Sequence, residues 1–306
     1  MTVATDPAPI ALRENSYAIV RGLFDPGIAG RLREICERVL GQWRRAPRSD
    51  NPPVGLQANY MRHVNDPEYH RDHPDDLAFL LDAVGAPQVT KAIGEALDED
   101  YFFQMTSLYF NPTGDSQDGF WHKDKIGAEA DVALVPETGA GLQLQIALMP
   151  TDDLELVPGS HLRDYTREEH AICVADEERN NRSNEMPGAV RVELQPGDAA
   201  LFTQLCIHRG RYHTDKLRRT LMVSVKKKVT AEYSLRQRGL DPYSDQPWFL
   251  LPDYLRGVSP ESRVFFQNFI DYYAPHWRAR FTEVLKYSSL LQRFAESGAP
   301  NPFFAE

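Results

Sequence analysis

Between about residues 101 and 230, short strand-like segments follow one another at close intervals, and this pattern constrains the fold more than any other feature. FFQMTSLYF (102–110) is rich in aromatic and β-branched residues, and LQLQIALM (142–149) alternates apolar and other side chains with a period of two. Pro-Gly and Gly-Asp turns separate the further strand-like segments VRVEL, DAALFT and TLMVSVKKK. Many short strands with such turns predict a β-sandwich or a barrel.

Helical patterns lie on both sides of these strands. After the strand-like YAIVRGLF (17–24), the chain turns at Asp25-Pro26, a good N-cap and first helical position, and apolar residues then recur at helical spacing up to Trp43. Other helical patterns cover residues 75–85, 87–97, 265–273 and 281–294.

This order of elements predicts one α+β domain over residues 1–306, a sandwich or barrel buttressed by helices. We expect a mainly helical part over about 1–100, a β-barrel core over about 101–230 and a helical part over about 231–306. The glutamines at alternate positions of LQLQIALM give one polar face, which suits a barrel that holds a ligand.

A polar insertion interrupts the strands at about residues 161–188 and contains the charged run DEERNNRSNE. A long segment of this kind is typical of a lid. Because it is charged and poor in apolar anchors, we expect it to be mobile without substrate and to become ordered when substrate binds.

Composition excludes several classes of protein. Acidic residues (44) outnumber basic ones (34), so the formal charge is −10 and a nucleic-acid partner is not expected. No segment approaches the roughly 18 apolar residues of a membrane span, and no signal peptide is recognisable. Three scattered cysteines are too few for a disulfide framework. We therefore expect a cytoplasmic monomer or homodimer that acts on a small molecule.

Four of the nine histidines precede an aspartate by two residues, and their contexts differ. His70 and His73 lie just before a helical pattern, where capping and surface roles are the simplest interpretation. His122 and Asp124 lie in a strand-like segment, in which residues i and i+2 point the same way and can share a metal ion.

A third ligand must then come from a distant strand. His208, in DAALFTQLCIHRG, is the preferred candidate, and His213 is its competitor. Two histidines and one carboxylate on one face leave three coordination positions open, as in the non-haem Fe(II) oxygenases.

Several segments, in this order, resemble the phytanoyl-CoA dioxygenase family of Fe(II)- and 2-oxoglutarate-dependent oxygenases. They are YAIVRGLFDP, FWHKD, ELVPGSH, PGDAALF, IHRG and RRTL, and they cover about Tyr17 to Val225. The resemblance implies a double-stranded β-helix, that is, a jelly-roll or cupin-like barrel. It also implies Fe(II), 2-oxoglutarate and O2 as cofactor and co-substrates, with His122, Asp124 and His208 as the iron ligands.

The resemblance further implies an arginine that binds the distal carboxylate of 2-oxoglutarate. Arg219 is preferred because it lies 11 residues after His208, which is the family's usual interval; Arg218 is the alternative, and alternation along TLMVSV does not decide between them. Tyr109 matches a position that often contacts the co-substrate. The expected substrate contacts are Gln143, Gln145, Lys123 and His213.

The implied reaction is oxidation of an unactivated C–H bond, with release of succinate and CO2. An aspartate at position 124 favours hydroxylation, since related halogenases carry a small residue there. Two alternatives stay open: a cupin-like metalloenzyme that does not use 2-oxoglutarate, and a catalytically silent binding protein on the same scaffold. The sequence does not identify the substrate.

Overall fold

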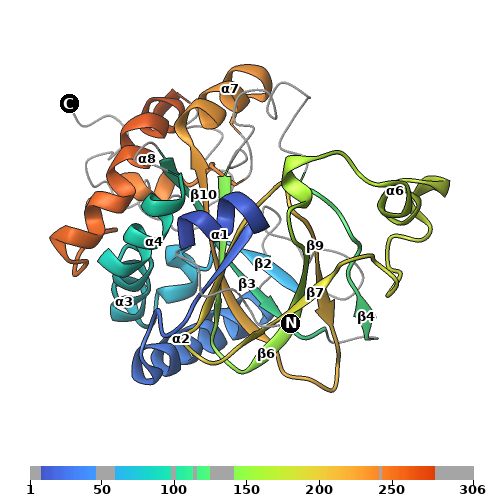
Figure 1. Cartoon of the computed structure of the whole chain (residues 1–306). Helices are drawn as coiled ribbons and strands as arrows, with labels where there is room; N and C mark the ends of the chain where they lie inside the picture. The colour runs from blue at the N-terminus through green and yellow to red at the C-terminus, as the bar shows by residue number, and fades with distance from the viewer. Residues whose placement is uncertain are drawn as a thin grey trace.

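Two antiparallel sheets dominate the computed structural model, which describes residues 8–45, 59–97, 101–112, 116–124, 141–240 and 243–279 (Figure 1). The larger sheet has six strands, in the order β1 (Tyr17–Val20), β8 (Ala199–Thr203), β5 (Gly141–Ala147), β10 (Arg219–Lys227), β3 (Tyr101–Phe110) and β2 (Tyr60–Arg62). The smaller sheet has four, in the order β4 (Gln117–Asp118), β9 (Ile207–Tyr212), β6 (Thr151–Val157) and β7 (Val190–Leu194).

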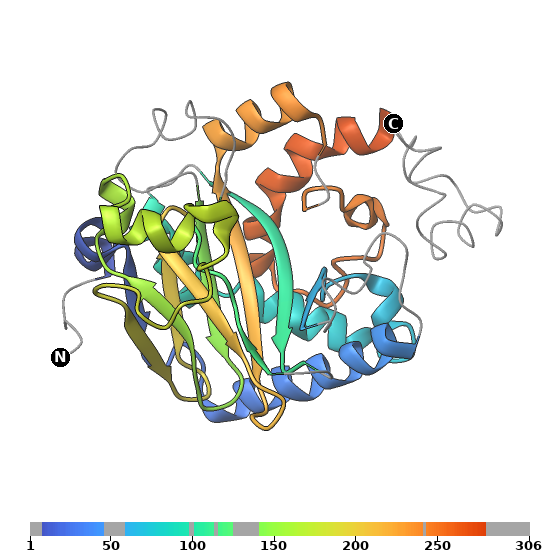
Figure 2. The same ribbon diagram turned by 90° about the vertical axis from the view of Figure 1, so that its right-hand side faces the viewer.

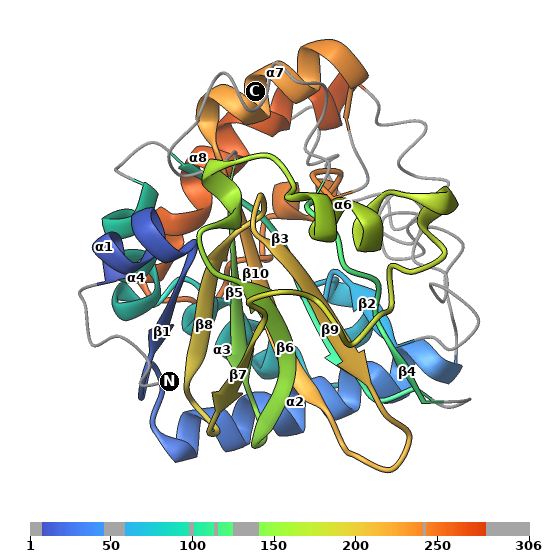
Figure 3. The ribbon, with the colours of Figure 1, turned by 45° about the vertical axis from the view of Figure 1, so that its right-hand side comes forward.

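The two sheets pack face to face. Buried side chains of the larger sheet, such as Ala147 and Phe202, form one apolar cluster with Leu154, Leu156 and Val192 of the smaller sheet. Two antiparallel sheets that enclose a common interior are the arrangement of a jelly roll, so the expected sandwich is confirmed. Figure 3 shows the strands of both sheets running alongside one another.

Helices cover the other face of the larger sheet (Figure 2). They are α2 (Pro26–Arg45), α3 (Pro74–Val84), α4 (Pro87–Leu97) and α8 (Pro260–Ala279), whereas α1 (Ala8–Asn15) lies at the β1 edge and α7 (Lys228–Arg238) continues from the end of β10. The buried apolar side chains of α2, α3, α4 and α8 form one large core with the sheet residues Leu144, Leu221 and Val223. No helix in the described parts of the chain is long and apolar enough to cross a membrane.

The N-terminus of α2 agrees with the sequence prediction. Asp25 Oδ1 accepts a hydrogen bond of 2.9 Å from the Ile28 amide, as an N-cap does, and Pro26 is the first helical residue. The apolar stripe from Leu32 to Trp43 is buried. The helical pattern at 281–294 lies outside the described residues.

His70 was expected at the surface, and this expectation is wrong. Its side chain is only 3% exposed, and Nε2 lies 2.8 Å from the carbonyl oxygen of Val64. The residue belongs to a 3-10 turn (Pro67–His70) whose N-cap is Asp66, so the capping carboxylate comes from a position before the histidine.

The polar insertion is folded. It contains a 3-10 turn (Ser160–Leu162), the helix α6 (Arg167–Cys173) and a second 3-10 turn (Asp176–Glu178). Thr166 and Glu169 form a capping box at the start of α6. Cys173 and Met186 are buried in a cluster with Trp121. The insertion was expected to be poor in apolar anchors, and the few that it has are buried. Its ordering on substrate binding stays a prediction.

Candidate metal centre

Three side chains that the sequence singled out converge in the interior. His122, Asp124 and His208 each offer one ligand atom, and these atoms lie within 4.8 Å of one another. Asp124 Oδ1 is 3.4 Å from His122 Nε2 and 3.9 Å from His208 Nε2. The competitor His213 lies elsewhere, with its Nε2 3.6 Å from Asp118 Oδ1.

Backbone carbonyls orient both imidazole rings. His122 Nδ1 is 2.8 Å from the Phe120 carbonyl oxygen, and His208 Nδ1 is 2.9 Å from that of Cys206. A carbonyl can only accept, so each Nδ1 carries a proton, and Nε2 is the ring nitrogen that each histidine can offer to a metal ion. Metal-binding histidines commonly have such a partner on the second nitrogen. The three residues therefore fit a divalent metal ion of the first transition row.

The two histidines face each other across paired backbones. The His122 amide donates to the His208 carbonyl at 3.1 Å, and the His208 amide donates to the His122 carbonyl at 2.9 Å. The Asp124 amide donates to the Gln204 carbonyl at 2.9 Å. Each ligand of the candidate centre thus has its main chain fixed by a neighbouring segment.

A slip in strand pairing turns His122 inward. Asp118 lies opposite Arg211 in β4 and β9, and their side chains form an ion pair on the outer face, with 2.7 Å between Arg211 Nε and Asp118 Oδ1. In a regular strand His122 would share that outer face, because it is four residues further on. The next pairing joins His122 to His208, not to Ile207, so the strand contains one extra residue.

The charges of the centre favour a cation. Burial, aided by His122, lowers the pKa of His208 to about 4, so this ring is neutral at pH 7. Burial opposes ionisation of Asp124, but the hydrogen bond from His122 and the charges of both histidines outweigh it and lower the pKa of the carboxyl. Burial also opposes protonation of His122, but Asp124 outweighs it and raises the pKa of His122. An ionised Asp124 therefore lies between a neutral His208 and a His122 whose proton a metal cation can displace.

The alternating glutamines of β5 point into the interior. Gln143 Nε2 donates to Asp124 Oδ2 at 2.6 Å, which leaves Oδ1 directed at the histidines. Gln145 lies on the same face, opposite Met222, whereas Leu142 and Leu144 join the core under the helices. A role of the two glutamines in substrate binding stays a prediction.

Arg219 points away from this interior, and this direction corrects the preference for it. The guanidinium forms a two-pronged ion pair with Glu37 of α2, at 2.7 Å from Nε and 3.0 Å from Nη2. Arg219 shares its face of β10 with Leu221, which belongs to the core under the helices.

Arg218 faces the interior instead. Its guanidinium carbon lies 5.1 Å from the ring centre of Tyr109 and 4.9 Å from that of Tyr212, and Nη1 donates to the Arg211 carbonyl at 3.1 Å. The side chain is 3% exposed. A Cβ on Gly210 would lie 2.7 Å from the Tyr212 hydroxyl and 3.0 Å from Arg218 Nη1, so a side chain at this position would displace both groups.

Lys123 also differs from the expectation of a substrate contact. Its ammonium group donates to the carbonyls of Ser160 and Arg163, at 2.7 and 2.8 Å, because residue 123 points to the face opposite its neighbours His122 and Asp124. His213 lies beside Asp118 at the outer face. These two residues are therefore removed from the candidate site.

Tyr60 and Tyr212 also lie at the interior face, although no sequence motif pointed to them. The Tyr60 ring lies 5.0 Å from the Tyr109 ring, and the Ser107 hydroxyl donates to the Tyr60 hydroxyl at 3.2 Å. Tyr212 has the same parity in β9 as His208, which is a signal that sequence alone could have used. Tyr60 lies in a three-residue strand that has too few residues to show a pattern.

Comparison with known proteins identifies the family of the chain. The family model of phytanoyl-CoA dioxygenase (PhyH) matches residues 12–220. The chain belongs to the phytanoyl-CoA dioxygenase family. The matched segment of this PhyH chain includes all three candidate ligands and both arginines. No curated protein matches the chain.

Solved structures share the fold of this PhyH chain. AviO1 from Streptomyces viridochromogenes Tue57 is 18% identical, with a TM-score of 0.54 over 74% of this chain and 97% of AviO1. The α-ketoglutarate-dependent epimerase SnoN from nogalamycin biosynthesis is 16% identical, with a TM-score of 0.51 over 77% of this chain and 88% of SnoN. EctD from S. alaskensis, solved with 2-oxoglutarate and 5-hydroxyectoine, is 15% identical, with a TM-score of 0.55 over 83% and 85%. These likenesses confirm the expected jelly-roll fold.

Proposed function

We propose that this PhyH protein is an Fe(II)- and 2-oxoglutarate-dependent dioxygenase that hydroxylates an unactivated C–H bond of a small molecule, with release of succinate and CO2. The observation that carries the proposal is the convergence of His122, Asp124 and His208, with both Nδ1 atoms engaged by carbonyls. Such a facial set leaves three coordination positions for co-substrate and O2. Iron and 2-oxoglutarate would together supply the oxidising power, and the protein would supply position and electrostatics.

Arg218 is the proposed partner of the distal carboxylate of 2-oxoglutarate. It is buried on the face that carries Tyr109 and Tyr212, and its planar guanidinium can bind a carboxylate through two parallel hydrogen bonds. Tyr109 and Tyr212 hold the guanidinium between their rings. This arrangement argues against a cupin-like enzyme that does not use 2-oxoglutarate, because such an enzyme has no need of a buried arginine there.

Gln143 is proposed to keep Asp124 in a fixed orientation through the bond to Oδ2. An intact carboxylate at this position favours hydroxylation over halogenation and argues against a silent binding protein. Epimerisation, as named for SnoN, and ring closure would use the same centre. The identity of the products must therefore decide between these outcomes.

The first test is turnover. Purified protein with Fe(II) and O2 should convert 2-oxoglutarate to succinate, and the correct substrate class should stimulate this conversion. A screen of acyl-CoA thioesters, free amino acids and natural-product intermediates, read by succinate formation and by product mass, separates the candidates. Absence of O2-dependent succinate with every compound would contradict the proposal.

The ligand assignment has its own test. We expect His122→Ala, Asp124→Ala and His208→Ala each to abolish Fe(II)-dependent turnover, because each removes one of three protein ligands. His73→Ala is the control, since His73 is exposed and caps no helix through its side chain. Full activity in His208→Ala together with loss in His213→Ala would overturn the assignment.

A further inference from the structure

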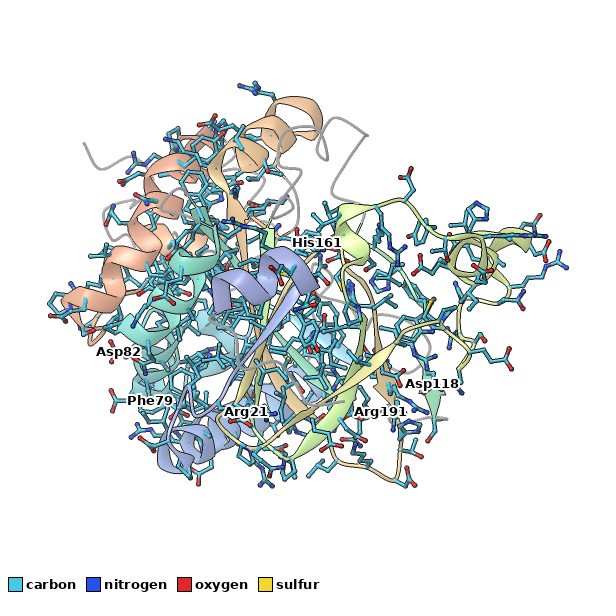
Figure 4. All side chains as sticks on the ribbon, in the orientation of Figure 1. Arg21, Phe79, Asp82, Asp118, His161 and Arg191 are labelled. Atoms are coloured by element: carbon cyan, nitrogen blue, oxygen red, sulfur yellow. The ribbon has the colours of Figure 1, made fainter. Side chains whose placement is uncertain are left out.

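The residues next to the metal ligands share an outward direction. Trp121 and Lys123 flank His122, and Arg209 follows His208. Because successive strand residues point to opposite faces, these three side chains lie on the outer face of the smaller sheet. The insertion with α6 lies on the same side of the molecule, away from the helices α3 and α8 (Figure 1). In Figure 4, Asp118 and Arg191 mark this side, and Phe79 and Asp82 mark the helical side.

Trp121 attaches the insertion to the strand of His122. Its amide donates to the Asn181 carbonyl at 2.6 Å, and its indole Nε1 donates to the Ser183 carbonyl at 2.8 Å. The ring is 2% exposed and packs with Cys173, at the end of α6 in the middle of the insertion, and with Met186 near its C-terminal end.

Lys123 makes a second attachment at the start of the insertion. Its ammonium binds the carbonyls of Ser160 and Arg163 and lies 5.0 Å from the ring centre of Tyr165. The lysine is one residue from both His122 and Asp124. A single side chain therefore connects the insertion to the main chain between two ligands.

Arg209 attaches the same insertion to the strand of His208. Its Nη1 donates to the carbonyls of Arg182 and Ser183 at 3.1 and 3.2 Å. Its Nε pairs with Glu155 at 2.6 Å, and its guanidinium carbon lies 4.5 Å from the centre of the Trp121 ring. The two strands that carry the histidines are thus bound to one segment of chain.

We propose that residues 160–186 form a brace that fixes the metal ligands from behind, in place of the substrate lid expected from the sequence. The inference rests on the proposed metal centre. Neighbouring Cα atoms are about 3.8 Å apart across a rigid peptide, so displacement of Trp121, Lys123 or Arg209 displaces the adjacent ligand. Ligand distances in metal sites lie within about 0.2 Å of the values set by the metal and the ligand type. The brace therefore sets metal affinity without touching the metal.

Metal affinity provides the first test. Lys123→Met keeps the aliphatic stem but removes both bonds to the brace, and Trp121→Phe removes the indole donor. Each should raise the dissociation constant of Mn(II), measured from the paramagnetic resonance signal of the free ion, by about tenfold or more, the range usual for outer partners of a metal site. Arg191→Met is the matched control, because Arg191 also binds Glu155 on this outer face but comes from β7 and flanks no ligand. It should change the constant less than twofold.

Two further measurements separate a brace from a general packing effect. The visible spectrum of the Co(II) form should shift in Lys123→Met, because ligand geometry changes, and should stay unshifted in Arg191→Met. Mn(II) alone, without 2-oxoglutarate or substrate, should slow hydrogen exchange of the amides at 160–186, because coupling between two sites is reciprocal. A lid would gain protection only with substrate.

The outcomes are distinct. Unchanged Mn(II) affinity and Co(II) spectra in both variants would overturn the brace and leave the metal centre intact. Protection that requires substrate would restore the lid. No Mn(II) or Co(II) binding by the unmodified protein would overturn the metal centre, and the brace with it.

Discussion

Arg218 and Arg219 show how neighbouring residues with the same side chain take separate roles. Arg219 is paired with Glu37 on the helical face, and Arg218 lies between two tyrosine rings on the interior face. The interval from His208 favoured Arg219, but this interval counts the residues of a hairpin and contains no information on side-chain direction. The direction follows from strand pairing. Met222 shares the face of Arg218 and lies opposite Gln145, which points into the interior, so Arg218 points into the interior as well.

We expect Arg218→Ala to weaken 2-oxoglutarate binding by about 10²–10³-fold. Loss of one partner from a buried pair costs roughly 3–5 kcal/mol, and about 1.4 kcal/mol corresponds to a factor of ten. Arg218→Lys should recover part of the loss, since an ammonium lacks the planar fork. Titration calorimetry of the Mn(II)-loaded protein without O2 measures the constants. A large loss in Arg219→Ala with none in Arg218→Ala would restore the original assignment.

His70 should make stability depend on pH. Burial lowers its pKa to about 4, against about 6.5 in the unfolded chain, although the bond to the Val64 carbonyl acts in the opposite direction. The folded protein favours the neutral ring, whereas the unfolded chain binds a proton more readily. The free energy of unfolding is therefore not reduced by His70 above pH 6.5, and it falls as pH decreases from 6.5 to 4. The loss is about 3 kcal/mol.

His70→Gln keeps a donor but does not titrate, so the free energy of unfolding of this variant in urea should fall less between pH 7 and pH 4. Parallel profiles of the two proteins would contradict this prediction.

At the scale of elements, the long amphipathic α2 was predictable because its cap and its apolar stripe agree. The strand β9 shows no apolar alternation, because its interior face carries His208 and Gly210 and its outer face carries two arginines, so only the expected metal ligand placed it among the strands. The slip that turns His122 inward was also invisible, since an extra residue in a strand depends on its partner's register and not on its own sequence.

Gly119 lies at this slip and tests its importance. A Cβ there would lie 2.5 Å from the Gly210 carbonyl oxygen, a main-chain atom that cannot yield without opening the strand pair. Gly119→Ala should therefore cost roughly 1–3 kcal/mol of unfolding free energy and weaken Mn(II) binding. Gly30→Ala in α2, where a Cβ meets nothing within 4 Å, should instead be neutral or stabilising. Equal metal affinity in both variants would show that the pairing at Gly119 does not govern the ligands.

At the scale of the whole molecule, the large apolar core and the candidate metal centre lie on opposite faces of the larger sheet. The helices and the sheet share one large apolar core, whereas the metal ligands, Gln143 and Arg218 lie on the interior side. The order of helices and strands in the sequence was enough to predict these layers. Which residues lie on which face of the sheet depends on the strand register, and the register is visible only in the three-dimensional structure.

Phe269 tests this separation. It is fully buried in α8, with its ring 5.3 Å from that of Phe103 and 5.2 Å from that of Trp277. Phe269→Ala should lower the free energy of unfolding by about 3–5 kcal/mol. The protein that stays folded should bind Mn(II) with unchanged affinity, whereas His208→Ala should lose metal binding and keep most of the stability of the metal-free form. Matching losses of affinity in the two variants would show that the faces are not separable.

The ion pair between Arg219 and Glu37 has a practical consequence for shortening or fusing the chain. The pair connects the start of β10 to α2 at the residue next to Arg218. The helix on one face of the sheet therefore helps to fix the Arg218 guanidinium on the other face. All three candidate metal ligands follow residue 120, so a truncation that removes α2 would leave them in the chain. Such a truncation would remove a large part of the apolar core and, with it, the support of Arg218, the proposed co-substrate residue. A fusion partner is therefore better attached before Tyr17 than inside the segment that leads to Glu37.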